Sequence, residues 1–195
     1  MTGEDFKALV ARSFREPRAA ARALLSLDWP IAARWQLLAL ALVLGMGLVQ
    51  ISLFLTPEGR QAMAEDRAPG LVLLGVIQAV ALVGTVVVVH MVARFLGGAR
   101  PFEDAVMVVG WLQAVMLLVQ AAQIALLLVL PGVSALVGML SFALLMWMMT
   151  GFVAELAGSP TLARVFFALL LGLVALVVVL AFLLVPLGLT GALIL

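Results

Sequence analysis

Five glutamine side chains lie within long apolar stretches, where polar groups are rare. They are Gln50, Gln78, Gln113, Gln120 and Gln123. Because helical residues seven and three positions apart share a face, we expect Gln113, Gln120 and Gln123 to lie together. An amide in apolar surroundings needs hydrogen-bond partners, so this face is expected to point toward other helices. Two hypotheses follow: the amides join helices, or they line a polar cleft for a lipid headgroup or small solute.

A second group consists of ionisable side chains near the ends of the apolar stretches. Its members are His90, Arg94, Arg100, Glu103, Asp104, Glu155 and Arg164. Ionisable groups inside a membrane are candidates for function, whereas those at its boundary extend toward water. Only His90 is expected to lie below the interface. It is either held by Glu155 or a backbone carbonyl, or it carries protons and responds to pH.

The remaining residue types exclude most catalytic chemistry. The sequence has no cysteine and one histidine, so thiol catalysis and a multi-histidine metal site are excluded. It contains no nucleophile-elbow, Walker or dinucleotide-binding motif. We therefore expect no enzymatic activity, no cofactor and no catalytic metal. The basic residues form no concentrated run, so nucleic acid is not an expected partner.

Composition and hydropathy indicate that membrane-spanning helices carry these side chains. The chain is 66% hydrophobic and 11% charged, against roughly a half and a quarter in soluble domains. A helix needs about 20 apolar residues to cross the hydrocarbon core. Five stretches reach this length: residues 35–55, 70–95, 105–130, 133–153 and 162–187. The expected fold is all-α, a polytopic membrane protein with a bundle of five transmembrane helices.

The residues before the first span predict a short amphipathic helical segment. Phe6, Leu9 and Phe14 recur at helical spacing among basic residues, and Pro17 opens a second helix. This segment is expected to lie among lipid headgroups, to pack on the inner ends of the spans, or to do both. The expected domains are residues 1–30 for the amphipathic segment and 31–195 for the five-helix domain.

The distribution of basic residues predicts the orientation in the membrane. Nine of the eleven Lys and Arg residues fall on the side of the N-terminus, and Arg60 and Arg67 fall on the other. Basic residues are enriched on the cytoplasmic side. The N-terminus is therefore expected in the cytoplasm and the C-terminus outside. Abundant Arg, Ala, Gly and Val suggest a GC-rich bacterial genome, which favours a bacterial cytoplasmic (inner) membrane.

The order of these parts resembles the Yip family, the Ypt/Rab-interacting membrane proteins, in its bacterial branch. The features that carry the resemblance are the basic helix PRAAAR at 17–22, the loop LGGARPF at 96–102 with Ala105 and Gly110 after it, and the loop ELAGSPTLAR at 155–164. The resemblance implies a five-helix domain with a cytoplasmic N-terminus. Eukaryotic members bind prenylated small GTPases. This chain lacks tyrosine and a long acidic N-terminal region, so we do not extend that property to it.

Together these features predict a non-enzymatic membrane protein that binds lipid or another membrane protein and helps to organise the membrane. Its expected partner surface is the amphipathic segment with residues 94–104. The alternatives are a small-solute transporter or channel that uses the glutamine face, also between protomers of a homo-oligomer, and an accessory subunit of a larger membrane complex. Transport is less favoured because no span carries an acidic or basic residue at its middle.

Overall fold

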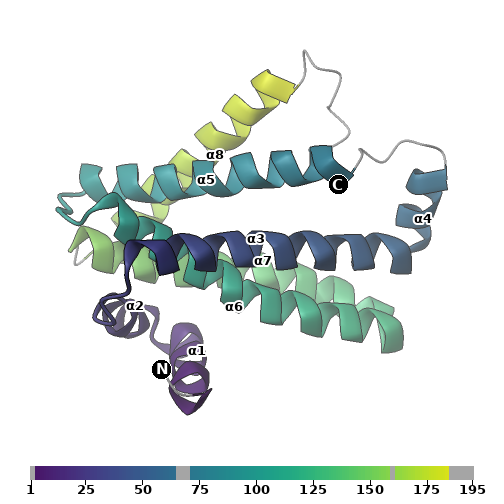
Figure 1. The fold of residues 1–195 in the computed structure, drawn as a ribbon, viewed down its shortest axis with the longest axis horizontal. Coiled ribbons are helices and arrows are strands. Elements are labelled where there is room, and N and C mark those ends of the chain that lie inside the picture. Colours follow the sequence, from purple (N-terminus) through teal and green to yellow (C-terminus); the bar gives the residue numbers. More distant parts are fainter. Residues whose placement is uncertain (1–2, 65–70, 159–160, 185–195) are drawn as a thin grey trace.

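The computed structural model describes residues 3–64, 71–158 and 161–184, and these residues form eight helices and no strand. The helices are α1 (Gly3–Arg15), α2 (Pro17–Leu25), α3 (Ile31–Leu55), α4 (Pro57–Ala64), α5 (Leu71–Phe95), α6 (Phe102–Val129), α7 (Pro131–Ala157) and α8 (Leu162–Leu184). Helices α3, α5, α6, α7 and α8 are long and apolar enough to cross a membrane. The predicted all-α, five-span fold is therefore confirmed (Figure 1).

The predicted spans differ from these helices mainly at their ends. Helix α7 continues past 153 to Ala157, because Gly158 with φ 62° is the residue that ends it and donates its N–H to the Glu155 carbonyl. Helix α4 was not predicted, and Pro57 begins it. Residue 70 and residues 185–187 of the predicted spans lie outside the described residues.

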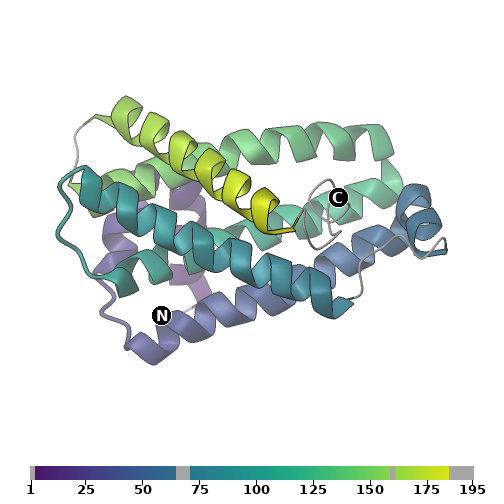
Figure 2. The same ribbon diagram turned by 90° about the horizontal axis from the view of Figure 1, so that it is seen from above.

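The five spans form two layers. Helices α3, α6 and α7 lie side by side, and α5 with α8 lies over them (Figures 1 and 2). Small residues let α5 and α8 approach closely: Leu176 packs on Gly84, and Val88 packs on Gly172. A Cβ atom at Gly172 would lie only 2.7 Å from the Val88 side chain. Such close backbone contacts stabilise helix pairs in lipid, where the hydrophobic effect does not drive them together.

Helices α1 and α2, called the head below, lie across the spans beside one end of α6 and α7 (Figure 1). That end of the bundle is called the head end. The apolar side of the head faces inward, with Leu9, Ala20, Ala21 and Leu24 buried. The amphipathic segment predicted from the sequence is therefore present, and it packs on the spans.

Burial is concentrated at the head end. Every residue of α6 from Asp104 to Leu112 is buried, whereas Leu128 and Val129 near its other end are exposed. Helix α6 has 28 residues, or about 42 Å at ~1.5 Å per residue, which exceeds a hydrocarbon core of about 30 Å. The head packs against the buried end of α6.

Candidate functional site: a groove between the head and two spans

Three contacts fix the position of the head on the spans, and one of them continues into a hydrogen bond within α1. The Trp111 Nε1–H donates to the Ser13 hydroxyl at 3.0 Å, and this hydroxyl donates to the Leu9 carbonyl at 2.9 Å. The Trp147 Nε1–H donates to the Phe14 carbonyl at 3.3 Å. Phe6 meets the Trp111 ring edge-on, with centroids 5.4 Å apart. The head is therefore joined to both α6 and α7.

Helix α2 meets α7 at two further points. Pro17 lies directly on Gly151, where a Cβ atom would be 2.5 Å from the proline Cγ. One turn farther along α7, Glu155 accepts two hydrogen bonds from Arg22, from Nε at 3.0 Å and from Nη2 at 3.2 Å. The Arg18 Nε lies 3.9 Å from the same carboxylate. The hydrogen bond and the charge of Glu155 raise the pKa of Arg22 above its usual value.

A buried ion pair joins α3 to α6 at the head end. The Arg34 guanidinium donates from Nη1 to Asp104 Oδ1 and from Nε to the Trp29 carbonyl. Arg100 donates to the other oxygen of Asp104 at 3.1 Å. Both Arg34 and Asp104 are buried. One carboxylate therefore binds two arginines and holds the first span, the α5–α6 loop and α6 together.

A large open groove of about 1050 Å³ lies between α2, α7 and α8. The end of α1 and the start of α2 provide its charged edge, with Arg15, Glu16, Arg18 and Arg22. Helices α7 and α8 provide its walls, which are mainly apolar: Phe142, Ala143, Met146, Trp147, Thr150, Gly151, Leu162, Ala163, Phe166 and Phe167.

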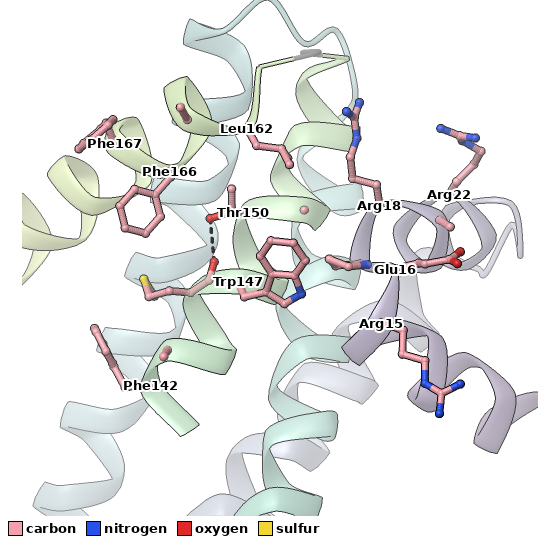
Figure 3. A pocket seen from close by; sticks show the side chains of 16 residues that line it. Arg15, Glu16, Arg18, Arg22, Phe142, Trp147, Thr150, Leu162, Phe166 and Phe167 are labelled. Carbon is pink, nitrogen blue, oxygen red and sulfur yellow. Dashed lines mark hydrogen bonds between the residues drawn. The ribbon is translucent and has the colours of Figure 1, made fainter. Parts of the chain in front are cut away.

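Figure 3 shows how these side chains lie in the groove. Arg18 and Arg22 extend in the same direction from α2, whereas Arg15 points the opposite way. The Trp147 ring stands between α7 and the head. The Thr150 hydroxyl donates to the Met146 carbonyl at 2.7 Å, so its proton is already used. The groove therefore combines a cationic edge with an aromatic and aliphatic interior.

The ionisable group predicted from the sequence is only partly brought together. Arg100 and Asp104 are paired, but Glu155 is bound by Arg22 and does not bind His90. The His90 ring instead meets Phe102 edge-on, with centroids 5.3 Å apart. Glu155 binds a different partner from the one predicted because the packing of the head brings Arg22 to it.

The other members of that group lie farther from the groove. Arg94 is exposed and lines a very small cavity with His90 and Arg100. Glu103 is half-buried, Arg164 is exposed, and neither makes an ion pair with a residue that the structure describes. The structure thus favours Arg18 and Arg22 of the head as the cations at the groove.

The glutamine side chains meet two different neighbours. Gln78 of α5 and Gln113 of α6 both approach Gly45 of α3, with Nε2 atoms 3.1 and 3.8 Å from the position of a Cβ there. Gln123 instead lies against Gly138 of α7. Gln113 and Gln123, which were expected to share one face of α6, therefore contact two different helices, α3 and α7.

The two remaining glutamines are half-buried. Gln50 of α3 and Gln120 of α6 make no hydrogen bond with a described residue. The groove between α2, α7 and α8 contains none of the five glutamines.

The fold and the groove define a class: an integral membrane protein with five apolar helices and an amphipathic head packed on one end. A family model described as the Yip1 domain matches residues 11–183. The chain therefore belongs to the Yip1 domain family, as the resemblance in the sequence predicted. The search of curated proteins returned no match, and the search of solved structures returned none.

Proposed function

We propose that this Yip1-domain protein is a non-enzymatic membrane protein that binds a membrane lipid in the groove and organises the bilayer around the head. The groove between α2, α7 and α8 is the observation that carries this proposal. Its charged edge and apolar interior match a molecule with a polar headgroup and long acyl chains.

The exposure of the apolar walls supports a ligand that arrives from the bilayer. Phe142, Trp147 and Phe167 are exposed at 63%, 50% and 66% of their surface. Exposed aromatic side chains on spans normally face lipid. Acyl chains can therefore reach the groove laterally, without leaving the hydrocarbon core.

The proposed environment is a bacterial cytoplasmic membrane with the head on the cytoplasmic side. Nine of eleven basic residues fall on the side of the head, which is the distribution of a cytoplasmic face. In this orientation the groove opens to the leaflet that carries anionic lipid next to the cytoplasm. A membrane-protein partner or a second copy of the chain remains an alternative occupant of the same surface.

Native mass spectrometry of the protein, released from its own membrane in mild detergent, tests the proposal. We expect one retained lipid per chain. Ala143→Trp fills the groove with a large ring and is expected to abolish this retention. Ala122→Trp is the matched control, because Ala122 is exposed on α6 and does not line the groove.

Two results would contradict lipid binding in the groove. One is a lipid-free protein, and the other is equal loss of lipid in both tryptophan variants. Deletion of the whole head is less informative, because Leu9 and Leu24 belong to the buried core and Arg22 neutralises Glu155. Its removal would damage the spans as well as the groove.

A further inference from the structure

The edge of the groove carries more positive than negative charge at its ion pairs. Among the described residues, Arg18 and Arg22 both form ion pairs with a single carboxylate, that of Glu155. One positive charge is therefore left without a partner there. A phosphodiester carries one negative charge, so an anionic glycerophospholipid complements this edge. A zwitterionic lipid would add a further cation beside the arginines.

Arg18 has the hydrogen-bonding capacity that a phosphate requires. Its only ion pair with a described residue is the 3.9 Å approach to Glu155, which is too long for a hydrogen bond. Its side chain is 36% exposed, so the guanidinium can turn toward a ligand. Planar guanidinium groups bind phosphate through two parallel hydrogen bonds.

Arg22 binds Glu155 and still has N–H donors available for a ligand. Glu155 uses the Nε and Nη2 atoms of Arg22, whereas a guanidinium has five N–H donors. The Arg22 side chain is 70% exposed, and that of Glu155 only 14%. The carboxylate therefore lies behind the arginines, on the protein side, and leaves their outer edges accessible.

The start of α2 adds a second attraction for an anion at the same place. Pro17, Arg18 and Ala19 form its first turn and line the groove. The first N–H groups of a helix have no partner within the helix, and the helix dipole is positive there. Pro17 has no N–H, and the N-cap residue, Glu16, makes no capping hydrogen bond, so the N–H groups not used by a cap are those of Arg18 and Ala19.

From these observations we infer that the groove binds one anionic glycerophospholipid, with the phosphate at Arg18 and Arg22 and the acyl chains along Trp147 and Phe166. The inference rests on the proposed lipid-binding function and names the class of lipid. Glu155 competes with the phosphate for Arg22 and thereby limits the strength of binding.

The test uses the full chain in micelles that contain equal amounts of phosphatidylglycerol and phosphatidylcholine with identical acyl chains. Native mass spectrometry then gives the ratio of the two retained lipids. We expect a preference for phosphatidylglycerol of about tenfold, since charge-assisted hydrogen bonds are among the strong ones. Arg18→Gln is expected to bring the ratio close to one, and Arg18→Lys to keep part of the preference.

Two further variants separate this site from general electrostatic attraction. Arg164→Gln removes a charge from the first turn of α8 without touching the groove, so the ratio is expected to stay at the wild-type value. Glu155→Gln removes the competing charge, and an amide oxygen can still accept a bond from Arg22. The preference for phosphatidylglycerol should therefore rise about threefold.

The outcomes distinguish this inference from the proposed function. Retention of both lipids in equal amounts would overturn the anionic preference while leaving lipid binding intact. The anionic preference would also be overturned if Arg18→Gln and Arg164→Gln lowered the lipid ratio equally. It would likewise be overturned if Glu155→Gln lowered this ratio while the unfolding midpoint of the protein stayed unchanged. Loss of all lipid from the wild-type chain would instead contradict the proposed function itself.

Discussion

Asp104 shows how much of the head end depends on a single carboxylate. It accepts hydrogen bonds from Arg34 and from Arg100, and it is buried with Arg34. A buried ion that loses its partner keeps the cost of dehydration without the compensating attraction. Asp104 is therefore expected to be needed for stability, whichever ligand the groove binds.

Replacement of Asp104 by Asn tests this role. Asp104→Asn leaves Arg34 buried beside a neutral amide, so we expect a loss of about 3 kcal/mol in the free energy of unfolding. Intrinsic tryptophan fluorescence during thermal unfolding in detergent measures it. Glu103→Gln, on the neighbouring half-buried residue, is the control and should change stability by less than about 0.5 kcal/mol. Equal effects of both variants would show that the pair is not structural.

The hydrogen bond between Ser13 and Trp111 joins the head to α6. Ser13→Ala leaves the buried Trp111 N–H without its partner, at a cost of about 1–3 kcal/mol. A double-mutant cycle with Trp111→Phe should give a coupling energy of about 1 kcal/mol in unfolding experiments. Ser26→Ala is the control, since Ser26 is exposed and its hydroxyl donates to the nearby carbonyl of Ala23. A coupling near zero would mean that the hydrogen bond between Ser13 and Trp111 does not help to hold the head on α6.

For single residues, the sequence indicates the place of a residue in its helix better than it indicates the residue's interaction partner. An acidic residue suits the first turn of a helix, and Asp104 does lie in the first turn of α6. Its partner Arg34 is 70 positions away, and no local pattern connects the two residues. Arg34 stands just before the apolar run at 35–55, and in a sequence an arginine that flanks a span cannot be told from a buried ion-pair partner.

Among the elements, the contact between α2 and α7 depends on a glycine. Gly151→Ala would place a Cβ atom 2.5 Å from Pro17 Cγ, and the rigid proline ring cannot move aside. We expect a destabilisation of about 1–3 kcal/mol, as for other overpacked contacts. Hydrogen exchange should also become faster in residues 3–25, because the head separates from the spans.

Gly47→Ala is the matched control for that change. Gly47 lies within α3, and a Cβ atom there would have nothing within 4 Å. Since glycine weakens a helix, this substitution should stabilise the protein by up to about 1 kcal/mol. If both glycine variants gained stability, the close approach of Pro17 to Gly151 would be contradicted.

The spans were predictable because each is an unbroken apolar run of sufficient length, with Pro131 dividing the two central ones. The packing of the head was not decided by the sequence. Phe6, Leu9 and Phe14 indicate an amphipathic helix, but the same pattern fits a membrane surface or a protein surface. The groove could not be predicted either, because its residues come from positions 15–22, 142–151 and 162–167, which only the tertiary fold brings together.

The whole molecule has two unlike ends. The head and the α5–α6 loop lie at one end, and α4 lies at the other (Figure 1). Because the natural chain has no cysteine, single cysteines can report this arrangement. Lys7→Cys and Ala99→Cys should react with an impermeant maleimide only from the cytoplasmic side. Gln61→Cys in α4 should react only from outside, and labelling of all three from one side would contradict the proposed topology.

Trp147 provides the most direct measure of lipid in the groove, because its ring lies there and is half exposed. The measurement is quenching of tryptophan fluorescence by brominated phosphatidylglycerol in phosphatidylcholine vesicles. The chain has four tryptophans, so the signal of the Trp147→Phe variant is subtracted to leave the fluorescence of Trp147. A bound lipid predicts that quenching of Trp147 saturates at a low fraction of brominated phosphatidylglycerol, and that brominated phosphatidylcholine is much less effective. Quenching that rises in proportion to either brominated lipid would show that Trp147 meets only bulk lipid, and would contradict a lipid site in the groove.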